Sequence, residues 1–168
     1  MAALERGVAP QPAEEFAAWV EPHLPALARL AGRLVDPADR DDVVQEALLR
    51  AWQKRTTYDE SRGSPRVWLL AILRDRARRH HLRTPPGPTL AREPVIEQHP
   101  SDIDLERALA ALSPRQRLAV DLYYFVDLDV ATTALVMGCA PGTVKATLSQ
   151  ARARLAELLG LTGETADD

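Results

Sequence analysis

The chain has 168 residues, a formal net charge of −3 at pH 7, and 46% hydrophobic but only 5% aromatic residues. That length holds one ordinary domain or two small ones, and a composition rich in helix formers and poor in aromatic residues predicts an all-α fold. The single cysteine excludes an internal disulfide and a cysteine-rich zinc site. The apolar runs are too short to span a membrane and the first residues lack a signal-peptide pattern, so we expect a cytoplasmic protein that has no membrane partner.

Opposite charges are concentrated in two different parts of the sequence. Between Asp36 and Leu49 five acidic residues accompany one arginine, whereas residues 62–83 contain seven arginines and one acid, Asp75. The distribution of charge informs about binding more than the net charge does. The two segments therefore predict two faces for two different partners, although a solvated helix surface is the alternative for each.

The first predicted helix covers residues 16–34, after a flexible lead-in at residues 1–12. Apolar residues recur at steps of three and four over this range, which is the spacing of one helical face. Pro22 and Pro25 remove backbone donors near its middle, so we expect them to break or kink the helix there.

Two further helices follow before the middle of the chain. Asp36 is a candidate N-cap with Pro37 at the first helical position, which predicts a helix that runs to Trp52. A polar loop comes next, and Ser64 with Pro65 predicts a second start of the same kind. This later helix has an apolar stripe and ends in the arginine-rich run.

A proline-rich stretch at residues 84–101 divides the chain into two modules. It contains five prolines and no hydrophobic periodicity, which is the composition of an extended linker. We therefore expect one helical module at residues 13–83, a second at residues 102–160, and an acidic tail at residues 161–168.

The second module shows four helix starts and one clear helix end. Gly138 is expected to end the third helix, and the fourth extends to about Leu159. The four starts are Ser101, which with Asp104 resembles a capping box, Ser113 before Pro114, Asp129 as an N-cap, and Pro141.

The stretch "ALVMGCAPGTVKATL" has the pattern of a helix-turn-helix: a short helix, a glycine-containing turn and a longer helix. In this motif the first residues of the second helix face base edges in the major groove, and later ones reach phosphates. An amphipathic hairpin with a polar outer face is the alternative. The candidate DNA-binding residues are Thr143, Lys145, Thr147, Gln150 and Arg152.

The arginine-rich segment is a second candidate for nucleic-acid binding. Its charge density suits a phosphate backbone. It also follows a loop and an aromatic-bearing helix start, which suit unstacked bases. The candidate residues are Arg62, Arg66, Arg74, Arg76, Arg78 and Arg79.

Enzyme interpretations find no support in the sequence. It has no glycine-rich phosphate loop and no nucleophile elbow, and His80 with His81 is not joined by further ligands at helical spacing. Cys139 is interpreted as a small buried filler rather than a reactive thiol. We therefore predict a protein that is not an enzyme and has no catalytic residue, metal or cofactor.

Four stretches in order give the chain a family resemblance: "DPADRDDVVQEALLRAW", "YDESRGSPRVWLLAIL", "LERALAALSPRQRLAVDLYY" and "GTVKATLSQARARL". They resemble the two conserved regions of extracytoplasmic-function sigma factors, small bacterial proteins of the sigma-70 family that direct RNA polymerase to promoters. The likeness extends from Phe16 to Leu159. It implies two helical domains, sigma region 2 and sigma region 4 with a helix-turn-helix, joined by a variable linker.

The resemblance also implies partners and roles for individual residues. The partners are the β′ and β subunits of the RNA polymerase core, promoter DNA, and in many such proteins an anti-sigma factor. The loop at residues 56–64 and the arginines after it would bind the −10 element as a single strand, and the helix from Pro141 would read the −35 element. The residues that would bind a coiled coil of the β′ subunit are Asp42, Gln45, Glu46, Leu49 and Trp52.

The chain departs from the family pattern in its reading helix. Ala140 stands where a capping serine is usual, and "ATLSQ" at residues 146–150 replaces a stretch with three residues able to carry positive charge. Asp75 stands where asparagine is common. We therefore expect a weak hold on DNA, which leaves two interpretations open: promoter reading through Thr147, Gln150 and DNA shape, or dependence on a helper protein.

Two other functions remain as alternatives. The first is a sigma-like interaction protein, or helper-dependent regulator, that binds an anti-sigma or activator partner. The second is a free-standing helix-turn-helix repressor, but that function gives no reason for the acidic segment that begins at Asp36.

Overall fold

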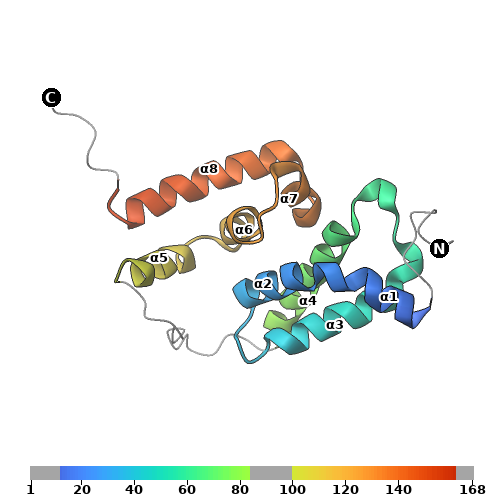
Figure 1. The fold of residues 1–168 in the computed structure, drawn as a ribbon. Coiled ribbons are helices and arrows are strands. Elements are labelled where there is room, and N and C mark those ends of the chain that lie inside the picture. The colour runs from blue at the N-terminus through green and yellow to red at the C-terminus, as the bar shows by residue number, and fades with distance from the viewer. Residues whose placement is uncertain (1–11, 84–99, 162–168) are drawn as a thin grey trace.

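The computed structural model describes residues 12–83 and 100–161 of the chain. Every regular element in these two ranges is a helix, which confirms the predicted all-α fold (Figure 1). The expected flexible lead-in, and most of the expected linker and tail, lie outside the described residues. Within the described ranges, no helix combines the length and apolar character needed to cross a membrane.

Residues 12–83 form the N-terminal module, in which α2, α3 and α4 pack against one another. Short 3₁₀ turns connect or extend the helices. The elements are α1 (Ala13–Val20), η1 (Glu21–His23), α2 (Leu24–Leu34), α3 (Arg40–Lys54), η2 (Arg55–Thr57), η3 (Glu60–Arg62) and α4 (Pro65–Arg83).

The predicted break in the first helical stretch is confirmed. The 3₁₀ turn η1 contains Pro22 and separates α1 from α2, which carries Pro25 in its first turn. Because proline supplies no N–H and fixes φ, it fits the first turn of a new helix better than a helix interior. After the break, Leu27 and Leu30 of α2 are almost completely buried.

The predicted N-cap at Asp36 is wrong. The chain first makes a separate turn, in which the N–H of Asp39 donates to the carbonyl of Asp36 over 2.9 Å. The regular i to i−4 bonding starts later, with the N–H of Val43 donating to the carbonyl of Asp39 over 3.0 Å. Helix α3 therefore begins at Arg40 with Asp39 at the N-cap position. A capping residue followed by proline predicts the start of a helix, but the same two residues can also form a tight turn.

Residues 100–161 form the C-terminal module. It begins with α5 at Pro100, so Ser101 lies inside the helix and the predicted capping box at this residue is wrong. The elements are α5 (Pro100–Ala110), α6 (Pro114–Val120), a π-helical turn η4 (Asp121–Phe125), α7 (Val130–Met137) and α8 (Pro141–Leu158).

The last three helices start with the same backbone geometry but not with the same cap. Ser113, Asp129 and Ala140 are all extended at ψ 153, 169 and 149°. Ser113 forms a full capping box with Gln116, and the Asp129 carboxylate accepts the N–H of Thr132 over 2.6 Å. Ala140 has no side-chain acceptor, so α8 starts without the bond that its two predecessors have.

The two modules share a hydrophobic core. Apolar residues of the C-terminal module join the cluster formed by α1 to α4, and helix α7 packs on α4 while η4 packs on α2. A second cluster lies inside the C-terminal module, between α5, α6, α7 and α8. In Figure 1 the N-terminal helices gather on one side and α5 to α8 on the other. The residues that enter the shared core from the second module are Leu122, Val126, Leu128 and Val136.

The unequal caps predict opposite effects of two substitutions. Ala140→Ser adds an acceptor at a residue whose backbone already has N-cap geometry, and we expect it to raise the free energy of unfolding by about 1 kcal/mol. Ser113→Ala removes the existing capping box and should lower that free energy by a similar amount. Urea unfolding followed by circular dichroism measures both. Equal shifts of the same sign would contradict the assignment of the caps.

Candidate nucleic-acid and protein interfaces

Helix α3 presents a polar face to solvent. Asp42, Gln45, Glu46 and Leu49 are spaced at three and four residues along it, which puts them on one side of the helix, and all four are exposed. Leu49 is 58% exposed although it is apolar. An exposed leucine among acidic and amide side chains gives this face a mixed polar and apolar surface.

Trp52 follows Leu49 by three residues on the same side of α3, but it is less exposed than the four residues of the polar face. Its ring packs edge to face on Phe16, with 5.2 Å between the ring centroids, and the guanidinium of Arg55 lies 3.7 Å from the Trp52 ring centroid. The side chain is half-buried against the main core. The family resemblance assigned this tryptophan to polymerase binding. The contacts support a mainly structural role.

The arginines of the second charged segment fall into two groups. Arg62, Arg78 and Arg79 are exposed and Arg76 is half-buried, so these four face solvent. At the end of α4 the two histidines bind protein atoms, His80 the Asp39 carboxylate over 3.1 Å and His81 the carbonyl of Leu34 over 2.6 Å. These bonds fix the last turns of α4 to the segment between α2 and α3.

Arg66 and Arg74 point toward the C-terminal module instead. Arg66 Nη2 donates to the carbonyl of Val126 over 2.7 Å, and Arg74 Nη1 donates to the carbonyl of Val136 in the last turn of α7. A cation at a helix C-terminus is favoured by the unpaired carbonyls and the helix dipole. Two candidate DNA contacts are thus engaged in holding the modules together.

Asp75 acts on the same contact. Its carboxylate accepts bonds from Arg74 Nε over 3.0 Å and from Arg74 Nη2 over 2.6 Å. The sequence suggested that this acid repels phosphate. In the structure Asp75 forms an ion pair with Arg74, whose guanidinium faces α7. The negative charge of Asp75 is therefore balanced within the protein.

A buried ion cluster between the modules is the feature that sequence reasoning missed. Arg33 of α2 donates through Nε to Asp121 over 2.8 Å and through Nη1 to Glu106 over 2.9 Å. Arg117 lies 3.8 Å from Asp121 and 3.9 Å from Glu106. The side chain of Asp121 has no exposed area. An acid inside the apolar run "LAVDLYYF" was the available signal, because a buried carboxylate requires a cationic partner.

Burial and ion pairing have opposite effects on the pKa values of the charged groups in this ion cluster. Burial raises the pKa of Asp121 above its ordinary value, although its hydrogen bond to Arg33 and the charge of Arg117 act in the opposite direction. Burial alone would lower the pKa of Arg33, but the bonds to Glu106 and Asp121 outweigh it and raise that pKa. The free-energy cost of removing these charges from water therefore offsets much of the stabilisation that their ion pairs provide.

Helix α8 displays most of the predicted reading residues. Lys145, Gln150 and Arg152 are exposed and Thr143 is half-buried near the helix start. Thr147 differs, because its side chain is only 6% exposed and its hydroxyl donates to the carbonyl of Thr143 over 2.7 Å. Thr147 therefore faces the core of its module and is not placed to contact bases.

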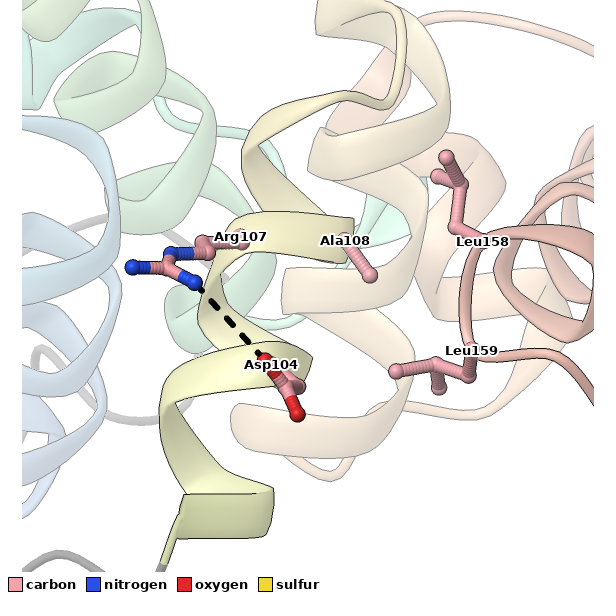
Figure 2. A pocket seen from close by; sticks show the side chains of 5 residues that line it. All are labelled: Asp104, Arg107, Ala108, Leu158 and Leu159. Carbon is pink, nitrogen blue, oxygen red and sulfur yellow. Dashed lines mark ion pairs between the residues drawn. The ribbon is translucent and has the colours of Figure 1, made fainter.

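A shallow cleft lies between α5 and the end of α8 (Figure 2). Leu158 and Leu159 face α5 across it, and Asp104 and Arg107 form an ion pair of 3.9 Å on the α5 side. None of these residues was a predicted site residue.

In the part of the chain that the structure describes, three or more His, Cys, Asp or Glu side chains nowhere gather in a way that could hold a metal ion.

Comparisons with known proteins match both modules. The family model "Sigma-70 region 2" matches residues 19–84 and "Sigma-70, region 4" matches residues 102–155. The chain is 34% identical over 152 residues to the RNA polymerase sigma-E factor of Streptomyces coelicolor, covering 86% of each chain. It is 33% identical over 157 residues to the ECF RNA polymerase sigma factor SigL of Mycobacterium tuberculosis, covering 86% of this chain and 89% of SigL.

Two solved structures resemble the whole described chain. The sigma factor RpoE in complex with the anti-sigma factor NepR, from Bartonella quintana, is 29% identical with a TM-score of 0.71, covering 89% of this chain and 99% of RpoE. CnrH in complex with the cytosolic domain of CnrY has a TM-score of 0.69 and 24% identity, covering 90% and 92% of the two chains. The second likeness concerns the fold alone.

Proposed function

Because the chain belongs to the extracytoplasmic-function sigma factors of the sigma-70 family, we propose that it binds the RNA polymerase core and directs it to promoters. It acts as a dissociable specificity subunit and has no catalysis of its own. The observation that carries the proposal is the presence of both sigma regions, in order, each with a solvent-facing surface of the expected chemistry. These surfaces are the mixed face of α3 and the polar face of α8.

In this function the α3 face binds the β′ subunit of the polymerase. Asp42 and Glu46 supply negative charge, Gln45 supplies an amide, and Leu49 supplies an apolar contact. Apolar contacts surrounded by polar residues are the usual construction of a specific protein interface. The half-buried Trp52 stabilises α3 through its ring contact with Phe16. The other large polymerase subunit, β, would contact the rest of the chain.

Promoter DNA is bound by the basic part of α4 and by α8. The exposed arginines of α4 bind the phosphates of the −10 strand, and the loop before α4 receives its bases. Helix α8 enters the major groove at the −35 element with Lys145 and Gln150 toward base edges and Arg152 toward phosphate. The neutral side chains of Ala146 and Ser149 lie on the same exposed surface and give this helix few charged contacts.

The weak reading helix keeps a helper-dependent version of this function open. An anti-sigma or activator protein would then bind the chain, and the activator would supply contacts that α8 lacks. The test is transcription by core polymerase and purified chain on pooled genomic fragments of the source organism. Specific starts without any further protein support independent promoter reading. Starts that require a second protein support the helper-dependent version, and no starts under either condition contradict the proposed function.

A charge reversal on α3 tests the polymerase surface. Glu46→Lys places a cation at the centre of the acidic face, and we expect it to weaken binding to core polymerase at least tenfold, because like charges across an interface oppose binding. Glu157→Lys is the matched control, since Glu157 is an exposed acid on the other module. Binding is measured by fluorescence anisotropy with labelled chain. Equal losses in both variants would show that net charge, and not this face, determines the affinity.

Salt dependence tests the DNA surface of α8. Arg152→Ala removes one proposed phosphate contact, so we expect weaker binding of the chain–polymerase complex to promoter fragments and a slope of log K against log salt that is reduced by about one. Arg107→Ala removes an equally exposed arginine from α5, outside the proposed surface. The expected result is an unchanged slope for Arg107→Ala. The same slope change in both variants would contradict the assignment.

A further inference from the structure

The contact between the modules covers a surface that the proposed function needs. Helix α7 packs along α4, and a Cβ added at Gly63 in the loop before α4 would lie 3.9 Å from Leu135 of α7. Arg66 and Arg74, on the same side of α4, bind carbonyls of the C-terminal module. In Figure 1 the short helix α7 lies next to the start of α4. This side of the first half of α4 is therefore covered, whereas residues 59–62 of the preceding loop remain exposed.

We propose that this contact is an inhibitory closed state of the chain, and that the ion cluster of Arg33, Asp121 and Glu106 is the latch that holds it. The latch itself is independent of any function assigned to the chain. Its consequence for DNA binding rests on the proposed function. Release of the C-terminal module would free the guanidinium groups of Arg66 and Arg74 for the phosphates of a single strand.

Closure and strand binding use the same donors. Arg66 Nη2 and Arg74 Nη1 each donate to a backbone carbonyl of the C-terminal module, and both residues are half-buried, so the closed state restricts their approach to phosphate oxygens. Arg78 and Arg79 remain exposed in the closed state. The closed chain thus keeps part of its positive surface. The two arginines nearest to the loop, Arg66 and Arg74, become available to DNA when the modules separate.

Arg33 is placed to act as the link of the latch. It belongs to α2 of the N-terminal module, and it binds Glu106 of α5 and Asp121 of η4, both in the C-terminal module. Its guanidinium also lies 4.1 Å from the ring centroid of Phe125. Arg117 faces the two acids from within the C-terminal module. Removing Arg33 therefore leaves the buried Asp121 and the partly exposed Glu106 without the cation from the other module.

The latch is built to be reversible. The carboxylate of Asp121 has no exposed area, and its second ion pair, with Arg117, is long at 3.8 Å. Water solvates these charges when the modules separate, which favours the open state. Burial also raises the pKa of Asp121, so its charge is held in the closed state at a cost. Apolar burial and imperfect polar pairing therefore act in opposite directions at one interface.

The lone cysteine allows a direct test in solution. Cys139 follows α7, next to Gly138, and a Cβ added at Gly138 would lie 3.9 Å from Arg74 Nη1 of α4. A nitroxide on Cys139 of the full chain should broaden amide NMR signals around Arg74 in the closed state. We expect Arg33→Ala to abolish this broadening in α4 while retaining it at the start of α8, within the same module. Arg29→Ala is the matched control, because Arg29 bonds to the carbonyl of Pro25 in its own helix.

Three results would overturn the proposal. Absence of broadening in α4 of the unsubstituted chain excludes the closed state, and broadening in α4 that persists in Arg33→Ala excludes the latch. Loss in Arg29→Ala as well shows that the effect is not specific to the ion cluster. Broadening at the start of α8 and an unchanged far-ultraviolet circular dichroism spectrum show that Arg33→Ala is folded. If that variant fails these checks, Glu106→Gln, which weakens the same latch from α5, is expected to reduce the α4 broadening.

A DNA measurement tests the inhibitory consequence separately. The probe is a fluorescein-labelled single-stranded DNA pool of random sequence, and anisotropy reports binding by the full chain. We expect Arg33→Ala to bind several-fold more tightly than the unsubstituted chain and Arg29→Ala to bind as the unsubstituted chain does, although both lose one positive charge. An open variant with unchanged DNA affinity overturns the inhibition. DNA binding by none of the chains contradicts the proposed DNA function, and the nitroxide result still decides the latch.

Discussion

The arrangement of this molecule depends on how a buried carboxylate is satisfied. Asp121 has no exposed side-chain area and lies in an apolar stretch of the C-terminal module. A charge in such a place needs a cation, and its closest one, Arg33, comes from the N-terminal module at 2.8 Å. The residues that follow, Leu122 and Val126, complete the core of the N-terminal module. The ion pair of Asp121 and the apolar contacts of Leu122 and Val126 therefore hold the two modules together at the same junction.

That junction determines which surfaces face solvent. The polar face of α3 and the outer face of α8 point away from it, so the proposed polymerase and −35 surfaces are both accessible while the modules are packed together. Helix α4 is divided, because Arg66 and Arg74 enter the junction and Arg78 and Arg79 do not. One helix thus contributes both to the contact between modules and to the proposed surface for single-stranded DNA.

The sequence predicted elements well where local chemistry decides them. The break at Pro22, the cap at Asp129 and the helix end at Gly138, with φ 66°, all follow from backbone constraints of single residues, and all are confirmed. It failed at Asp36 and Ser101, where a cap signal competes with a turn or with one more residue of helix. The pairing of Arg33 with Asp121 spans 88 residues. No periodicity reports such a contact, and the burial of Thr147 likewise depends on tertiary packing.

The weak cap of α8 and the closed junction have a common physical meaning. In the proposed function both reduce the hold of the isolated chain on DNA: α8 begins without a side-chain cap, and two arginines of α4 are bound to carbonyls. Polymerase binding through α3 requires neither feature to change, because that face is already exposed. In the proposed function, attachment to polymerase can therefore precede opening, and strand capture by Arg66 and Arg74 then compensates for the loss of the carbonyl contacts. In the proposed function, a chain built this way engages DNA firmly only as part of a larger assembly.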